Sequence, residues 1–517
     1  MNTLGGAALA LFAVLLPPNG GLYVLRHTGL KAKGPSADPR PDLETDFVQR
    51  KKRCSVSRRP IVPRNRDRSR ADSGPHRRRL MRPRLAAAVA AGLLLTGAQR
   101  ILDAQQLPAG VLSANVEAAG YSELDGRPGF KLAIKEANGR WYLYMGHLWD
   151  HGWTIVDVTE PTTPQVVKFI PYESPNAQNS WTIQMDVHGN RMLTNATSAG
   201  FEQGDPSKPH DAKVLIWDIS DPVNPRQVGE YEVATHRNYL LDENTMHLAA
   251  TPPGYGGNIN LVMDISDPAH LKEIGRFSFP GQHTGAGEKP TESGISQHGP
   301  PDVVGNVAYM GMGSAGLTVV DMTDPARPRM IGNLDFAPPF KSGTTSLHSA
   351  LKVRDKPLVI VNSEAGAEMC EEPLNFAAVV DVDDLANPRL ISLFPLPVPP
   401  AGVPYSDFCD KGGRFGPHNL NQLQHSPDVE RQGDLVYLTY FNAGLRLYDI
   451  SDPEAPKEVG FFIPPEPTKR YGANPTTRLA VQTEDVLVDR RGYIYITNKN
   501  QGLWILRNTG PRPSANP

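Results

Sequence analysis

Four histidines separated by long stretches of sequence occupy matching places in a repeated pattern. His236, His298, His348 and His418 each lie near the start of an expected innermost strand, and Glu484 takes the same place in the next repeat. Imidazole nitrogens and a carboxylate that converge on one point are suitable ligands for zinc, copper, iron or manganese. We therefore predict a site for a divalent transition metal, with the four histidines as its ligands.

Two further side chains are candidates for chemistry beside such a metal. His147 follows an expected second strand and would lie in a loop on the same face, where Glu364 takes a similar place in a later repeat. Imidazole titrates near neutral pH and suits an acid or a base. We predict His147 and Glu484 as catalytic residues, with Glu484 either a further ligand or an acid/base.

These residues converge only if similar units surround an axis, and the sequence contains such units. The pattern hydrophobic-Asp-hydrophobic-Ser/Thr-Asp/Glu-Pro-x-x-Pro recurs with variations, at about 60-residue spacing. Its copies are residues 155–164, 216–225, 262–271, 319–328, 379–388 and 447–456. Aspartate and proline form the turn after each strand. Each unit has room for four short strands.

Repeated units of four antiparallel strands are typical of a β-propeller. A truncated seventh unit occupies residues 485–506, and residues 116–121 offer the missing outer strand. We predict an all-β fold, a seven-bladed propeller of four-stranded antiparallel blades over residues 106–508, whose last blade is completed by an N-terminal strand that leaves no open edge.

The repeat resembles the LVIVD repeat family, named for a Leu-Val-Ile-Val-Asp-like core. The matching stretches include residues 215–222 and 317–321, and the resemblance covers roughly residues 110–508. It implies an exported or surface propeller and is almost silent about activity. Selenium-binding proteins of the methanethiol oxidase type are similar in architecture, because they hold a metal with channel histidines, although their motifs do not match this sequence residue by residue.

The first hundred residues look like targeting sequence. Residues 1–80 lack any strand or helix period, which predicts disorder or a gene-model artefact upstream of a true start at Met81; a real basic leader is the alternative. Residues 81–105 have the layout of a signal peptide, and residues 509–517 are expected to be a disordered tail. We expect a secreted, periplasmic or cell-surface protein.

Charge and cysteine content narrow the possible partners. The formal net charge is −2, but the first 105 residues are strongly basic, so the remainder is acidic and nucleic acid is not expected as a partner. Nothing from residue 105 onward could span a bilayer. Cys370 and Cys409 are expected to form a disulfide, with two unpaired thiols as the alternative. We expect a monomer.

Two functions are consistent with this sequence. The first is an exported module that binds a small molecule, a glycan or a protein at the histidine-lined mouth of its channel. The second is a metal-dependent enzyme, for which an oxidoreductase is the reaction class considered; whether the protein is catalytic stays open. The glycine-rich residues 406–417 lead into His418 and are expected to cover the mouth as a lid. Motifs of serine hydrolases, nucleotide-binding loops and redox dithiols are not found.

Overall fold

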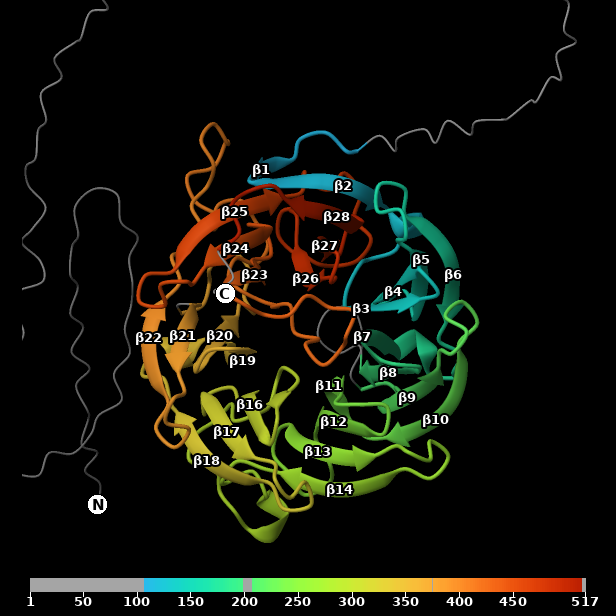
Figure 1. Ribbon diagram of the computed structural model, residues 1–517, viewed down its shortest axis with the longest axis vertical. Helices are drawn as coiled ribbons and strands as arrows, with labels where there is room; N and C mark the ends of the chain where they lie inside the picture. The colour runs from blue at the N-terminus through green and yellow to red at the C-terminus, as the bar shows by residue number, and fades with distance from the viewer. Residues whose placement is uncertain (1–106, 199–206, 374, 514–517) are drawn as a thin grey trace, which may run out of the picture. The chain divides into compact units, whose positions relative to one another are not determined.

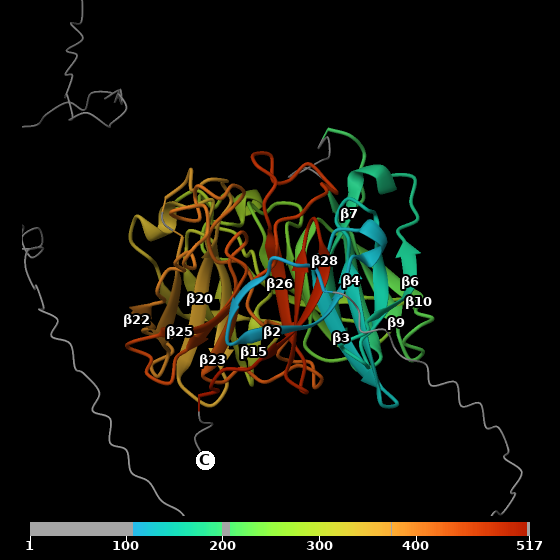
Figure 2. The same cartoon turned by 90° about the horizontal axis from the view of Figure 1, so that it is seen from above.

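The computed structural model describes residues 107–198, 207–373 and 375–513, and these form a ring of seven blades (Figure 1). Each blade is a four-stranded antiparallel sheet. Seen edge-on in Figure 2, the strands run between the two faces of the ring. The predicted all-β, seven-bladed fold is confirmed. The expected leader and signal peptide, residues 1–80 and 81–105, lie outside the described residues.

Five blades are formed by consecutive strands, ordered from the channel outward. They are β3 (Leu132–Ala137), β4 (Arg140–Gly146), β5 (Gly152–Asp157), β6 (Gln165–Pro171); β7 (Ser180–His188), β8 (Arg191–Ser198), β9 (Lys213–Asp218), β10 (Arg226–Glu232); β11 (Thr235–Leu240), β12 (Thr245–Ala250), β13 (Ile259–Asp264), β14 (Lys272–Phe277); β15 (Asp302–Val304), β16 (Val307–Gly311), β17 (Leu317–Asp321), β18 (Arg329–Leu334); and β19 (Thr345–Val353), β20 (Leu358–Glu364), β21 (Ala377–Asp381), β22 (Arg389–Leu393).

The last two blades each include a strand from the start of the described chain. The sixth sheet contains β23 (Leu435–Thr439), β24 (Leu445–Asp449), β25 (Lys457–Ile463) and β1 (Leu112–Ala114), and the seventh contains β26 (Thr483–Val488), β27 (Tyr493–Asn498), β28 (Gly502–Asn508) and β2 (Val116–Ser122). Both β1 and β2 lie at the outer edge, where they pair with β25 and β28.

The innermost position of the sixth blade differs from the other six. Residues 417–422 run beside β23 there, but they form only one isolated bridge, between Leu420 and Leu438. The backbone of Thr439 also exchanges hydrogen bonds with His418 and Asn419. A segment without a regular ladder follows the blade closely enough to keep His418 at the place expected from the other repeats.

The motif aspartates close the turns between the third and fourth strands, as predicted. Asp321 accepts a hydrogen bond from the backbone N–H of Thr323 at 2.9 Å and forms an ion pair with Arg329 at 2.7 Å. Asp218 makes the same pair of contacts with Ser220 and Arg226. These carboxylates stabilise the turns by binding the local backbone and an arginine. Their repetition therefore reflects a structural role rather than a catalytic one.

Packing between blades combines aliphatic and aromatic side chains. The cluster that joins the sixth and seventh blades includes Tyr437, Leu447, Val488, Ile496 and Trp504, all of them buried. Four 3₁₀ turns are the helical elements among the described residues: Leu124–Gly126, Ala177–Asn179, Thr284–Ala286 and Phe340–Ser342. None of the described segments is a helix long and apolar enough to cross a membrane.

A glycine at the bulge of several outer strands lets one blade touch the next. The strand register shifts near Gly229 in β10 and near Gly332 in β18. A Cβ on Gly332 would lie 2.0 Å from the carbonyl oxygen of Leu385, and one on Gly229 would lie 2.0 Å from that of Pro268. The outer strand therefore packs directly against the proline-containing turn region of the following blade.

Substituting Gly332→Ala is expected to lower the free energy of unfolding by about 2 kcal/mol, because the added methyl must displace backbone rather than a flexible side chain. The matched control is Gly433→Ala, since no atom lies within 4 Å of a Cβ at that position. The control should change stability by about 0.5 kcal/mol or less. Thermal unfolding of the two variants checks this, and equal melting temperatures would contradict it.

Candidate metal centre

The four histidines lie side by side around one end of the central channel. His236 is on β11 and His348 is on β19, while His298 precedes β15 and His418 precedes β23. Neighbouring rings, taken in chain order, have centroids 4.2, 4.5 and 5.1 Å apart. The repeated blades thus bring together four histidines that lie far apart in the sequence.

Glu364 at the end of β20 contacts three of these imidazoles. Its Oε2 lies 3.1 Å from Nε2 of His298 and 3.6 Å from Nε2 of His348, and its Oε1 lies 3.4 Å from Nε2 of His418. The sequence analysis noted Glu364 only as a loop residue on the same face. Its carboxylate is at the centre of the cluster, so it completes a set of nitrogen and oxygen donors.

Burial controls the charge of this cluster. It lowers the pKa of His236, His348 and His418 well below the usual value for imidazole. Burial alone would raise the pKa of Glu364, but its contacts with His418 and His298 outweigh that effect and hold it well below the usual range. Neutral imidazoles and an ionised carboxylate are the protonation states that bind metal ions.

Two features of the donor atoms fit a metal ion. One donor atom each from His298, His348 and Glu364 lie within 4.8 Å of one another. Nε2 of His348 is buried without a hydrogen-bond partner, whereas its Nδ1 lies 2.5 Å from Oγ of Ser349. A buried nitrogen left without a partner is rare in folded proteins and calls for an explanation such as an ion.

Glu484 lies behind the cluster and does not join the carboxylate at its centre. Its Oε2 is 3.3 Å from Nδ1 of His418, on the opposite side of the ring from Glu364. Its Oε1 is 3.1 Å from Nζ of Lys499 and 3.3 Å from Nη2 of Arg414. A carboxylate on the far nitrogen of a metal-binding histidine fixes the ring and its tautomer. The roles predicted for Glu484, a further ligand or an acid/base, stay predictions, and its position also suits a residue that orients His418.

The predicted lid carries a basic residue into the site. Nη1 of Arg414 lies 3.3 Å from Oε1 of Glu364, and its guanidinium lies 4.0 Å from the ring centroid of Phe441. The disulfide predicted between Cys370 and Cys409 is confirmed. It ties residues 406–417, which include Arg414, to the loop that follows β20.

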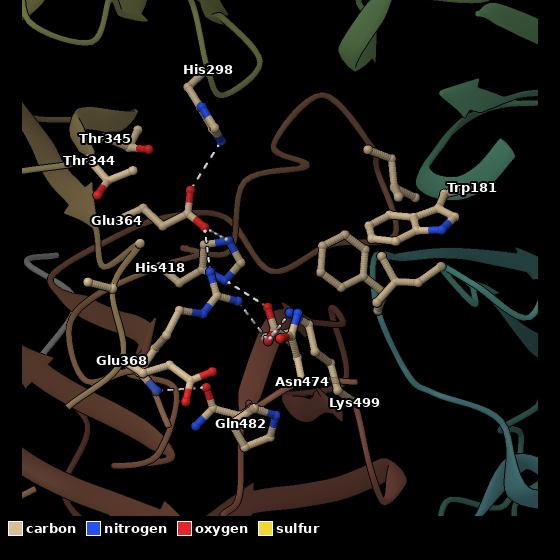
Figure 3. Close-up of a pocket in the computed structure, with 18 of the residues that line it drawn as sticks. Trp181, His298, Thr344, Thr345, Glu364, Glu368, His418, Asn474, Gln482 and Lys499 are labelled. Carbon is tan, nitrogen blue, oxygen red and sulfur yellow. Dashed lines mark hydrogen bonds and ion pairs between the residues drawn. The ribbon is translucent and has the colours of Figure 1, made fainter. Parts of the chain in front are cut away.

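A cavity of about 540 Å³ opens beside the histidines (Figure 3). His236, His298, His418 and Glu364 line it, together with the basic side chains that contact Glu484. Figure 3 shows His298, Glu364 and His418 across the cavity from Trp181. A cavity of this size holds a small organic molecule.

Comparison with known proteins identifies the repeat. The family model described as "LVIVD repeat" matches residues 257–278, 302–335 and 425–462. The chain carries LVIVD repeats. The structure is similar to the Cps50 (Swd1) β-propeller domain of Myceliophteria thermophila, at 12% identity over 77% of this chain and 99% of that one, with a TM-score of 0.46. It is also similar to a hypothetical selenium-binding protein from Sulfolobus tokodaii, at 12% identity over 72% of this chain and 88% of that one, with a TM-score of 0.47. No curated protein matches the sequence.

The first two blades depart from the histidine pattern. Lys131 and Thr182 take the corresponding places, nine residues before Arg140 and Arg191, where β4 and β8 begin. Nζ of Lys131 lies 3.0 Å from Oδ1 of Asp485 and donates a 2.6 Å hydrogen bond to Asn419, and burial lowers its pKa to about 8. Thr182 pairs with Leu148 through the backbone. Neither blade contributes a histidine to the cluster.

His147 is in the core of the first blade. The side chain is fully buried, with Nδ1 2.7 Å from the carbonyl of Pro128 and Nε2 2.5 Å from Oγ1 of Thr154. Burial lowers its pKa to about 4. His147 is not among the residues that line the cavity. The predicted acid or base role is untested, and both ring nitrogens are engaged in local contacts.

Residues 421–432 cross the opposite end of the channel, and we call them the crossing segment. Nε2 of His425 lies 2.8 Å from Oδ1 of Asp186 in the second blade. The backbone N–H of Glu430 donates to the carbonyl of Val488 in the seventh blade, and Asp428 accepts from the backbone N–H of Glu136 in the first.

Proposed function

We propose that this protein binds one divalent transition metal ion with His236, His298, His348, His418 and Glu364. The bound ion would be presented to a small molecule in the adjoining cavity. The observation that carries the proposal is the unpartnered Nε2 of buried His348, which lies 3.6 Å from Oε2 of Glu364. Imidazole-rich sites suit zinc, copper, iron and nickel.

The contact between two imidazoles supports the same proposal. Nε2 of His236 and Nε2 of His298 are 2.9 Å apart. A neutral imidazole carries one N–H, so one ring must donate to the other or both must share a cation. An ion at this point would also neutralise Glu364, which is nearly buried among the rings.

A catalytic function is the second candidate, with an oxidoreductase as the class considered from the sequence. It is favoured by the fact that the cavity reaches His236, His298, His418 and Glu364, so a substrate and the ion would meet. Binding of a glycan or protein at the same mouth is the non-catalytic form of the proposal. The disulfide supports a location outside the reducing cytosol, in line with export.

Metal analysis of the full chain tests the proposal. The protein is stripped with a chelator, dialysed, and titrated separately with Zn²⁺, Co²⁺, Fe²⁺ and Cu²⁺. We expect one ion per chain by elemental analysis, and visible Co²⁺ absorption bands with the intensity of a low-coordination nitrogen and oxygen site. Failure of all four ions to bind at micromolar concentration, with the propeller folded by circular dichroism, would contradict the proposal.

A further inference from the structure

The cavity beside the histidines has two unlike walls, contributed by different blades. The third to seventh blades supply the histidines, Glu364 and the basic groups. The first two blades supply Phe130, Leu148, Trp181 and Ile183. In Figure 3 the indole of Trp181 lies across the cavity from Glu364 and His418.

The apolar wall is part of a packed cluster rather than a set of loose surface side chains. Phe130, Leu148, Trp181 and Ile183 keep between 2% and 7% of their surface exposed, and the cavity is where they line open space. Trp149 packs edge-on against Trp181, with ring centroids 6.1 Å apart. Because this wall is held rigidly, it offers a preformed surface to a flat apolar group.

The opposite wall would carry excess positive charge once a metal ion is bound. Its basic residues are Arg237, Arg414 and Lys499. Glu364 and Glu484 are the acidic residues beside them, each already within ion-pair distance of Arg414, and Glu368 and the exposed Glu371 also line the cavity. Glu368, on the rim, accepts hydrogen bonds from the backbone of residues 476 and 477. A dication added to this set favours an anionic donor atom from the ligand.

We infer that the ligand of this site is a small aromatic oxyanion, a carboxylate or phenolate on a planar apolar body. The oxyanion lies on the metal side of the cavity, and the aromatic body lies against Trp181 and Phe130. This inference rests on the proposed metal site and adds the chemical class of its ligand. Burial of an aromatic body against the wall contributes affinity that a bare oxyanion cannot obtain.

The test uses the full chain loaded with Co²⁺ and three probes: 2-naphthoate, acetate, and uncharged 2-naphthamide. Binding is followed by the Co²⁺ absorption bands and by tryptophan fluorescence. We expect a Kd for 2-naphthoate at least about ten-fold below that for acetate, because naphthyl burial adds to the oxyanion contact. We expect 2-naphthamide to bind at least about ten-fold more weakly than 2-naphthoate, because it lacks the charge.

Variants of Trp181 separate the wall from the metal. Trp181→Ala should raise the Kd for 2-naphthoate by about ten-fold or more and leave the Kd for acetate and the Co²⁺ stoichiometry unchanged. Trp181→Phe should keep the Kd within about three-fold, which guards against a folding defect in the alanine variant. Trp217→Phe is the matched control, since Trp217 lies on β9 and does not line the cavity.

The outcomes separate the two proposals. If Co²⁺ binds but 2-naphthoate binds no more tightly than acetate, the ligand inference is wrong and the metal site stands. If 2-naphthoate binds well but Trp181→Ala has no effect, the assigned wall is wrong. If Co²⁺ does not bind to the folded wild-type chain, the metal site is wrong and the inference about its ligand falls with it.

Discussion

Replacing His298 and His348 together with alanine is expected to lower the affinity for Zn²⁺ or Co²⁺ by about a thousand-fold or more. Loss of a group that merely supports a metal ligand already costs about 10- to 100-fold. The double variant removes two direct donors of the set whose atoms lie within 4.8 Å of one another. Glu364 then keeps only His418 of the three imidazoles that it contacts.

Competition with a chromophoric chelator measures this change, and circular dichroism reports whether the blades remain folded. The matched control is His210→Ala with His270→Ala, because both of these imidazoles are exposed at the surface. The control should bind the metal like the wild type. Unchanged affinity in the His298/His348 variant, or equal loss in the control, would show that any bound ion sits elsewhere.

Acidification from pH 7 to pH 5 is expected to destabilise the metal-free protein strongly. Burial lowers the pKa of His147 and of His247 from 6.5 to about 4. Between these values the unfolded chain binds protons that the folded chain does not, so the free energy of unfolding falls as the pH falls. Each of the two contributes a loss of about 2 kcal/mol over this interval.

Thermal unfolding in the presence of a chelator, at several pH values from 7 to 5, measures how steeply the free energy of unfolding changes with pH. His147→Gln and His247→Gln should each reduce the slope by the contribution of one proton. His270→Gln should not, because His270 is exposed on the surface. A stability profile that is flat over this range, or slopes identical in all variants, would show that these buried rings become protonated without cost.

The fold and the histidine cluster were predictable because both depend on the same repetition. Alternating apolar residues followed by Asp-Pro turns specify the strands, and equivalent positions in successive blades must face a common axis. His236, His298 and His348 were aligned by their distance to the next strand, and His418 was assigned to the equivalent place in the sixth repeat. The structure places His418 beside the other three although its segment has no regular strand ladder.

The interior position of His147 follows from strand register. Tyr142 pairs with Asp157 in the first blade, and Leu358 pairs with Asp381 in the fifth. Counting from these pairs, Leu148 rather than His147 corresponds to Glu364. Alternate residues of a strand point to opposite faces, so a shift of one residue turns His147 into the core.

Other parts of the site depend on contacts between distant segments. Lys499 lies six residues after Tyr493, the first residue of β27, just as Glu364 lies six residues after Leu358, the first residue of β20. Lys499 is therefore the counterpart of Glu364 in the seventh blade, and both line the cavity. Arg414 comes instead from an irregular loop held by the disulfide. No periodic signal places such a residue, because its position is set by the loop's tertiary contacts rather than by strand alternation.

The crossing segment closes one end of the central channel. Its contacts with the inner-strand ends of several blades lie at the end of the channel opposite the histidines. A molecule that arrives at the histidines must therefore leave through the same opening of the channel. A long polymer could insert only one end there, since it cannot pass through the ring. The loops around this opening would control the rate at which ligands exchange.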